Sequence, residues 1–275
     1  MPTFSKTMAG GKVISGGALS PRGRRGNTAQ VAAYWSGGGG NPPPTVEYLV
    51  IAGGGSAGYS GGGGGAGGYR NSTSGELTGG GGSAESAFTV SGGTTYTVTI
   101  GAGAPGYPMG DGGNSVFGTI TSTGGGKGGH DAGSFIYTAG NLGGSGGAGA
   151  FTGYGGGGSG PRVTNPIQGN VGGNNGGIGG GAGADGASGG AGLASSITGT
   201  SVTRAVGLSG GASGAANSGS GGGRTGTWGG DGGSGIVIIR YLLSYDPAVV
   251  TGSPTLTTSG SYRIYQFTGS GTITF

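Results

Sequence analysis

The stretch from Tyr48 to Gly58 reads YLVIAGGGSAG, a short apolar segment that passes directly into glycine. The spacing of Gly53, Gly55 and Gly58 matches G-x-G-x-x-G, the loop that grips a dinucleotide pyrophosphate when it follows a strand and opens a helix. The motif has this meaning only if a helix follows, because the helix N-terminus supplies the N–H groups and the dipole that hold the pyrophosphate. The residues after Gly58 therefore decide between a nucleotide-binding fold and another architecture.

The segment that would have to form this helix, residues 59–75, is unsuited to it. It reads YSGGGGGAGGYRNSTSG, and eight of its 17 residues are Gly. At about 1 kcal/mol per Gly relative to Ala, the helix would lose about 8 kcal/mol before any packing. Glu76 lies near the place of a ribose-binding acid, but the residues after it do not form the second parallel strand that should present it. The sequence predicts no helix here, and the fingerprint is interpreted as a chance match inside glycine runs.

Glycine dominates the whole chain. The sequence has 275 residues, of which 85 are Gly and only 7% are charged, whereas an average soluble chain has about 7% Gly and about 25% charged residues. The bias is local, since residues 53–234 contain 70 Gly and residues 236–275 contain four. Disorder is one interpretation, but 21 aromatic residues and a net charge of only +4 are atypical of disordered chains. This balance favours an ordered structure.

Short strands are expected around and within the glycine-rich region, where β-branched and aromatic residues alternate with polar ones. The expected strands are 46–52, 87–90, 94–100, 115–121, 196–206, 236–243, 262–268 and 272–275. Glycine turns at 91–93 and 269–271 predict two hairpins, one between 87–90 and 94–100 and one between 262–268 and 272–275. The expected fold class is mostly β and irregular, with short antiparallel strands bracketing a glycine bundle and almost no α-helix.

The glycine runs lack the strict triplet repeat of collagen. Ordering 70 glycines costs roughly 0.5–1 kcal/mol each relative to Ala, or about 35–70 kcal/mol in all, so a folded form needs an extensive hydrogen-bond network. Extended left-handed helices of the polyglycine-II type have three residues per turn and leave every N–H and C=O free to pair with neighbouring segments. The sequence therefore predicts a polyglycine-II bundle, with the non-Gly residues at its surface or at its turns.

The sequence shows no cluster of residues that indicates catalysis. The chain has one His, His130, and no Cys, so disulfides and Cys-based metal sites are excluded. The nearest acid to His130 is Asp131, and this pair is interpreted as part of a loop tip; the other acids are widely scattered. We expect no enzymatic activity, catalytic residues, metal or cofactor, and an oxidoreductase is the least favoured class. No apolar run approaches the roughly 20 residues of a membrane span and no signal peptide is recognised, so we expect no membrane insertion and synthesis in a host cytoplasm.

Basic residues gather at the N-terminus, where residues 1–46 hold five bases and no acid. The cluster at Arg22, Arg24 and Arg25 could contact nucleic acid, but no recognised nucleic-acid module surrounds it and no nucleic-acid partner is expected. Residues 1–43 are interpreted as a basic attachment or docking arm. Residues 44–243 are predicted to be a glycine-rich domain bracketed by strands, and residues 244–275 a C-terminal β-hairpin segment.

Residues 44–275 resemble the glycine-rich domain of bacteriophage tail-fibre and tail-tip adhesins. The resemblance implies a sandwich of polyglycine-II helices joined by turns, with variable distal loops that touch a bacterial surface receptor. The first 43 residues match no recognised attachment module. The segments that carry the resemblance are VEYLVIAGGGSAG, GGTTYTVTIGAGA, NSVFGTITSTGGG, SSITGTSVTRAVGLSGG, GGDGGSGIVIIRY and SYRIYQFTGSGTITF.

Loops that combine aromatic rings, Pro and charge are the candidates for receptor contact, since aromatic residues dominate recognition surfaces. These loops are 103–112, 127–137, 151–154, 161–168 and 224–228. The candidate receptor-binding residues are Tyr107, His130, Phe135, Tyr137, Phe151, Tyr154, Arg162, Arg224 and Trp228. Alternatively, tyrosines such as Tyr59, Tyr69 and Tyr154 cover the sides of the bundle or pack a small core.

Two functions from different classes are consistent with the sequence. The first is a non-catalytic virion adhesin whose partners are an outer-membrane protein or glycan of a host cell and other tail proteins, with a homotrimer as a further expectation. The second is a structural or decorating virion or filament protein whose glycine-rich region mediates assembly. An ice-binding protein is less favoured, because such a protein would need a flat, regularly repeating face.

Overall fold

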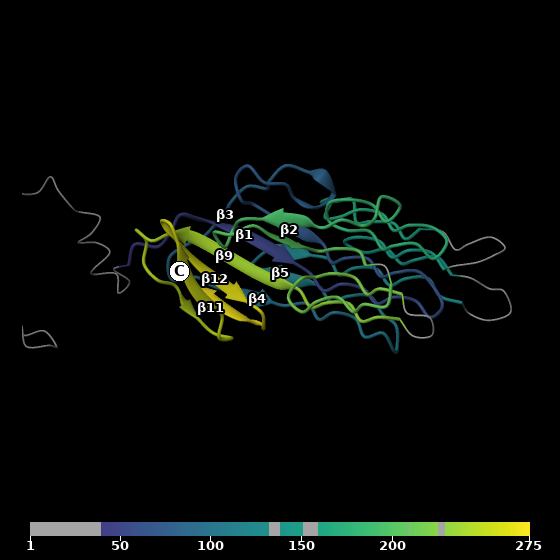
Figure 1. The fold of residues 1–275 in the computed structure, drawn as a ribbon. Coiled ribbons are helices and arrows are strands. Elements are labelled where there is room, and N and C mark those ends of the chain that lie inside the picture. Colours follow the sequence, from purple (N-terminus) through teal and green to yellow (C-terminus); the bar gives the residue numbers. More distant parts are fainter. Residues whose placement is uncertain (1–39, 132–137, 151–158, 209, 225–228) are drawn as a thin grey trace, which may run out of the picture. The chain divides into compact units, whose positions relative to one another are not determined.

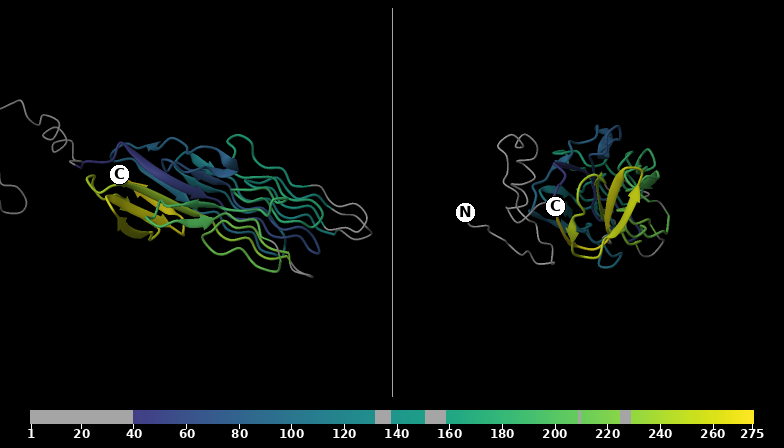
Figure 2. Two further views of the ribbon diagram at one scale, coloured as in Figure 1. Left: turned by 45° about the horizontal axis from the view of Figure 1, so that its top comes forward. Right: turned by 90° about the vertical axis from the view of Figure 1, so that its left-hand side faces the viewer.

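In the computed structural model, the structure describes residues 40–131, 138–150, 159–208, 210–224 and 229–275. The chain divides into two units, Met1–Asn41 and Pro42–Phe275, and the description below concerns the second. Within that unit the strands gather at one end, and the glycine-rich segments run side by side away from them (Figures 1 and 2). No α-helix occurs among the described residues, and a short 3-10 turn, η1 (Gly79–Gly81), is the sole helical element there. The expected mostly β and irregular fold class is confirmed.

Two antiparallel sheets form the strand-rich end. The six-stranded sheet has the order β11-β12-β9-β1-β2, with β3 also paired to β1; the five-stranded sheet has the order β10-β13-β4-β5-β6; β7 and β8 form a separate pair. The strands are β1 (Thr45–Ile51), β2 (Tyr69–Asn71), β3 (Phe88–Thr89), β4 (Thr95–Thr99), β5 (Ser115–Phe117), β6 (Ile120–Ser122), β7 (Leu193–Ser195), β8 (Val202–Arg204), β9 (Ile236–Leu242), β10 (Val249–Val250), β11 (Thr255–Ser259), β12 (Tyr262–Phe267) and β13 (Gly271–Thr274).

The apolar segment that opens the glycine region forms the centre of the larger sheet. β1 pairs with β9 in the register Leu49↔Ile238, so the two most apolar segments of the chain lie side by side. From Tyr48 to Ile51 both faces of β1 are covered, which explains why this part of the strand is continuously apolar rather than alternating. Val50 packs in a first core, between the two sheets, and Leu49 packs in a second core, on the opposite face.

The two cores have different partners. The first core brings β1, β9 and β12 of the larger sheet against Val98, Phe117 and Ile273 of the smaller sheet. The second core places Ile51 and the neighbouring strands against Tyr69 and against residues of the β7–β8 hairpin and the glycine region. Burying both faces of β1 and β9 anchors the glycine-rich segments to the sandwich.

Six of the eight predicted strands exist. The segment 115–121 instead forms two short strands, β5 and β6, because the chain turns at Gly118. Within 196–206 only β8 is a strand, since the residues before it form the loop that follows β7.

Both predicted hairpins are wrong. Segments β3 and β4 do not pair with each other, since β3 pairs with β1 and β4 pairs with β13. Likewise β12 pairs with β9 and β11, while β13 pairs with β4 and β10. The glycine turns instead pass the chain from one sheet to the other, and the true hairpins include β11–β12, β5–β6 and β7–β8. The strands within residues 244–275 therefore belong to the same two sheets as strands from residues 44–243 and do not form a separate hairpin segment.

The glycine runs are joined by backbone hydrogen bonds that recur every third residue. The N–H groups of residues 52, 55 and 58 donate to the run 62–68, those of 53 and 56 to the run 110–113, and those of 54 and 57 to the run 230–233, with N···O distances of 2.9–3.1 Å. The run 62–68 repeats the pattern toward three further segments, at 2.8–3.0 Å. A period of three is the one that a helix with three residues per turn produces, so this pattern supports the polyglycine-II prediction, which stays an interpretation.

The run 53–58 is enclosed by hydrogen-bonded segments. Its N–H groups reach three segments, and its carbonyls accept from residues 104, 125, 128 and 222 on three others. Such close packing depends on the absence of side chains. Non-Gly residues are nevertheless present inside the runs, because Ser56 and Ala57 are fully buried; the expectation that they lie only at the surface or at turns is wrong. Ser56 fits because its hydroxyl exchanges hydrogen bonds with the backbone of Gly110.

Candidate functional site

A pocket outside the sheets, at turns where glycine runs reverse, brings together residues from four connections between these runs. The connection at Tyr59 joins the runs 53–58 and 61–68, and the loop 103–112 contributes Tyr107. The volume is about 410 Å³, within the range of small-ligand sites. Its lining residues are Tyr59, Gly106, Tyr107, Met109, His130, Asp131 and Gly229.

Backbone contacts to the bundle fix the aromatic side of this site, the tip pocket. The backbone N–H of Tyr59 lies 3.1 Å from Sδ of Met109, and the Asp131 N–H donates to the Tyr59 carbonyl at 3.2 Å. Gly106 donates its N–H to Asp231 at 2.5 Å, which holds the start of the Tyr107 turn. The side chain of Tyr107 is 75% exposed and that of Tyr59 is 42% exposed, so both rings can reach a partner.

His130 supplies the polar wall. Its backbone N–H donates to the Thr138 hydroxyl at 2.7 Å, and that hydroxyl lies 3.0 Å from Nδ1 of the imidazole. Partial burial and the positive charge of Lys127 lower the pKa of His130 below its usual 6.5, against an opposing effect of Asp131. The imidazole is therefore neutral at pH 7 and presents both a hydrogen-bond donor and an acceptor.

The structure assembles part of the predicted set of receptor-binding residues. Tyr107 and His130 share the tip pocket. The backbone of Arg224 forms an isolated antiparallel β-bridge with Gly229, and Gly229 lines this pocket. Arg162 lies elsewhere: its guanidinium donates to the Gly169 carbonyl at 3.2 Å and to the Asn170 side chain at 3.1 Å, a contact that stabilises its own loop. Residues outside the described part of the chain are Phe135, Tyr137, Phe151, Tyr154 and Trp228, and the arm residues Arg22, Arg24 and Arg25.

Tyr59 and Met109 were not among the predicted contact residues. The alternative interpretation places Tyr59 on the side of the bundle or in a small core, whereas it lines the tip pocket. The sequence signal that identifies Tyr59 as a pocket residue is its position, because it is the large residue at the reversal between two glycine runs. Tyr69 does follow the alternative interpretation, since it is fully buried in the second core.

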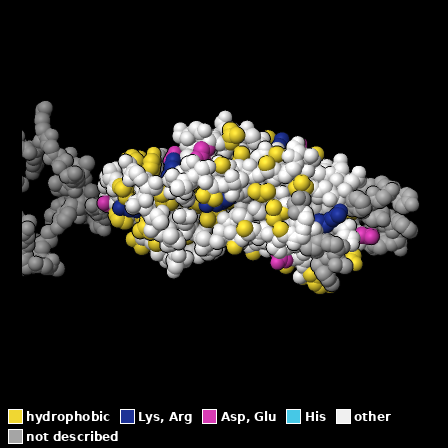
Figure 3. Space-filling view, in the orientation of Figure 1, with side chains coloured by type: hydrophobic (Ala, Val, Ile, Leu, Met, Phe, Trp, Pro, Cys, Tyr) yellow, Lys and Arg dark blue, Asp and Glu magenta, His cyan; other side chains and the backbone are white. Residues whose placement is uncertain are grey.

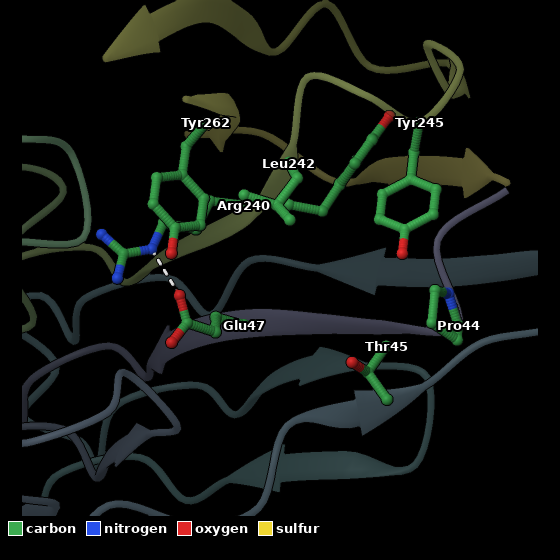
Figure 4. Close-up of a pocket in the computed structure, with 8 residues that line it drawn as sticks. Pro44, Thr45, Glu47, Arg240, Leu242, Tyr245 and Tyr262 are labelled. Atoms are coloured by element: carbon green, nitrogen blue, oxygen red, sulfur yellow. Dashed lines mark hydrogen bonds and ion pairs between the residues drawn. The ribbon is translucent and has the colours of Figure 1, made fainter. Parts of the chain in front are cut away.

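A second pocket, of about 200 Å³, lies where β1, β9 and β12 meet (Figure 4). Its charges are satisfied internally. Nε of Arg240 donates to Glu47 at 2.6 Å, and the guanidinium lies 4.5 Å from the ring centroid of Tyr262. Arg240 also reaches the carbonyls of Ser196 and Ile197. These contacts tie the strands together, so we assign Arg240 a structural part.

The face shown in Figure 3 offers little charge for recognition. Its charged side chains are few, on a largely uncharged surface. Within the described ranges no group of three or more His, Asp or Glu side chains has a metal-binding arrangement. No helix in that part of the chain has the length and apolar character needed to cross a membrane.

No family model matches the chain, and comparisons with curated proteins and with solved structures found no match.

Proposed function

We propose that this protein is a non-catalytic virion protein, a bacteriophage tail fibre or adhesin that binds a receptor on the host cell through loops on a glycine scaffold. The observation that carries the proposal is the tip pocket, where Tyr59, Tyr107 and His130 meet at the ends of hydrogen-bonded runs. Loops held by a rigid scaffold are the usual carriers of binding function.

The chemistry of the tip pocket suits recognition. Tyrosine supplies a large, rigid contact area with a polar tip at low cost in side-chain entropy. Tyr107 is the most exposed large apolar residue of the described chain, and neutral His130 adds a hydrogen-bonding group beside it. An outer-membrane protein or a surface glycan fits such a site. Residues 1–43 would then attach the protein to other tail components, and the protein would reside on the virion.

An assembly function is the alternative, and the edges of the sheets favour it. β11 is the outer strand of the six-stranded sheet, and its Leu256 is 55% exposed. β10 is the outer strand of the other sheet, and its Val249 is 72% exposed. Open edges with exposed apolar residues are sites where another chain can add a strand. A homotrimer or a decorating filament would use these edges rather than the tip pocket.

Adsorption of the purified full chain to a panel of bacterial strains, with competition against phage adsorption, tests the two functions. Tyr107→Ala should weaken adsorption at least tenfold, as expected for an aromatic hot spot, and should leave the melting temperature unchanged. Leu256→Ser is the matched surface variant and should adsorb normally. Failure of the unmodified chain to adsorb to any susceptible strain would contradict the receptor-binding proposal. Loss of self-association in Leu256→Ser, with no effect of Tyr107→Ala, would favour assembly.

A further inference from the structure

Arg204, at the end of β8, is a buried cation without a counter-charge. The residue is 8% exposed, and its Nη1 atom is inaccessible and has no hydrogen-bond partner. Other arginines of the described chain are paired: Arg70 with Glu85 and Arg240 with Glu47, while Arg263 donates to the Tyr245 carbonyl. A buried charge normally requires such a partner.

The neighbouring groups do not supply the missing negative charge. Tyr69 lies close enough to interact electrostatically with Arg204, but burial raises the pKa of its hydroxyl, so it is neutral. Glu76 is engaged elsewhere, by the Asn71 side chain and by the Ser196 N–H. Burial lowers the pKa of Arg204, yet guanidinium groups stay protonated in proteins. The positive charge therefore persists.

Arg204 lines a pocket of about 430 Å³ between the β7–β8 hairpin and the β11–β12 hairpin. The other walls are mostly hydroxyl and amide groups. The lining residues are Thr198, Gly199, Thr200, Val202, Arg204, Thr257, Thr258, Ser259 and Gln266. None of the residues of the tip pocket is among them, so the two pockets are separate sites.

We infer that this pocket binds a hydroxylated carboxylate, the chemical class of the hexuronic acids, with the carboxylate of the ligand paired to Arg204. A guanidinium matches the planar carboxylate geometrically and can bind it through two parallel hydrogen bonds from one edge of the fork. Because Nη1 is inaccessible, the carboxylate would pair with the Nε–Nη2 edge of Arg204. The Thr, Ser and Gln side chains both donate and accept hydrogen bonds, which suits the hydroxyls of a sugar ring. The inference does not depend on the tip pocket being a receptor site.

Titration of the full chain with D-galacturonate, by calorimetry and by thermal shift, tests this assignment. D-Galactose is the neutral control and inorganic phosphate is the control for simple ion binding. Galacturonate at a hundredfold excess over its Kd should raise the melting temperature by on the order of 5 °C, and the two controls should not. A short galacturonate oligomer that binds at least tenfold more tightly than the monomer would identify a polysaccharide as the source of the carboxylate; equal affinities would identify the free acid.

Variants separate ligand binding from folding. Arg204→Met should remove the galacturonate effect while keeping the unliganded protein at least as stable, because it replaces an unpaired buried charge with an apolar group of similar length. Thr257→Tyr should also abolish binding by filling the pocket, with Arg204 intact. Leu256→Tyr is the matched control and should bind normally, because Leu256 does not line the pocket. Leu256 pairs with Tyr265 of the first core, whereas Thr257 pairs with Ile264 of the second core, so the two side chains lie on opposite faces of β11.

Absence of galacturonate binding to the unmodified chain would overturn the inference. Equal binding by Arg204→Met, or an equal thermal shift with phosphate, would overturn it as well. Host-cell adsorption is a separate readout, so a failure here would leave the proposed receptor function unaffected and the reverse also holds.

Discussion

At the scale of single residues, glycine is required wherever two segments approach through their backbones. A Cβ atom placed on Gly54 would lie 2.0 Å from the Ser220 carbonyl oxygen, far inside any normal contact. The backbone N–H of Gly54 also donates to the carbonyl of Gly233 at 2.9 Å, which fixes Gly54 within the bundle. A side chain here would force two hydrogen-bonded segments apart, and not merely fill a gap.

Gly54→Ala should therefore destabilise the protein by about 3 kcal/mol or more, since overpacking costs about 1–3 kcal/mol even where side chains can adjust. Gly110→Ala is the control, because its Cβ would meet only the Ala104 methyl, at 3.9 Å. That change should be neutral or slightly stabilising, by up to about 1 kcal/mol, through a reduced entropy of the unfolded chain. Denaturant unfolding measures both, and similar midpoints for the two variants would contradict the close packing of the run 53–58.

His130 provides a second prediction at this scale, and as the single His of the chain it gives unambiguous ring signals in an NMR titration. The apparent pKa should lie below 6.5, because burial and Lys127 both disfavour the charged ring. The unfolded state then binds the proton more readily, so the contribution of His130 to stability is present above pH 6.5 and is lost as the pH falls through the folded pKa. Lys127→Gln should raise the pKa partway toward 6.5; a pKa at or above 6.5 in the unmodified protein would refute this description of the site.

At the scale of elements, side chains complete the hydrogen bonding where a glycine run reaches the surface. The run 124–130 donates every third N–H to a side-chain oxygen: residue 124 to Asn114 at 2.9 Å, residue 127 to Asp111 at 2.7 Å and residue 130 to Thr138 at 2.7 Å. These oxygens take the place that a neighbouring backbone fills inside the bundle.

Asp111→Ala should expose the amide of Lys127, speed its hydrogen exchange and cost about 1 kcal/mol, the usual net value of such a bond. It also removes the contacts of Asp111 with the Asn141 amide, at 3.1 Å. Asp111→Asn keeps an oxygen acceptor and should restore most of the protection at Lys127. Unchanged exchange at that amide in the alanine variant would show that the run does not need a side-chain cap.

The longer apolar or alternating strands were predictable from the sequence, whereas short strands such as β2, β7 and β10, the strand β11 and the pairing were not. Alternation in 94–100 and the apolar run in 46–52 follow directly from local burial, and β4 and β1 lie there. A glycine turn between two strands allows both a hairpin and a passage between sheets. When the chain passes from β3 in one sheet to β4 in the other, the apolar faces of the two strands meet across the core. The ring centroids of Phe88 and Tyr96, for example, lie 5.5 Å apart. The choice depends on tertiary partners, here β1 and β13, which lie far away in the sequence.

At the scale of the whole molecule, the sequence predicted that loop tips would carry a binding site, but it did not predict all the residues that line the tip pocket. Tyr107 and His130 were expected at loop tips because aromatic and polar residues interrupt glycine there. The contribution of Tyr59 depends on which glycine runs are neighbours, and near-identical runs carry no information about their order. The same limit applies to Arg204, whose isolation becomes apparent only when the acids around it are located.

The central claim is that the glycine runs form a hydrogen-bonded bundle that supports the tip loops. Amide hydrogen exchange resolved by residue tests it most directly. Slow exchange across residues 52–58, 62–68 and 123–129, comparable to that of β1 and β9, is the predicted result, because nearly every N–H in these runs donates to a neighbouring segment. Exchange at the rate of an unstructured chain in those runs, with protection confined to the strands, would contradict the claim and leave the tip pocket without a scaffold.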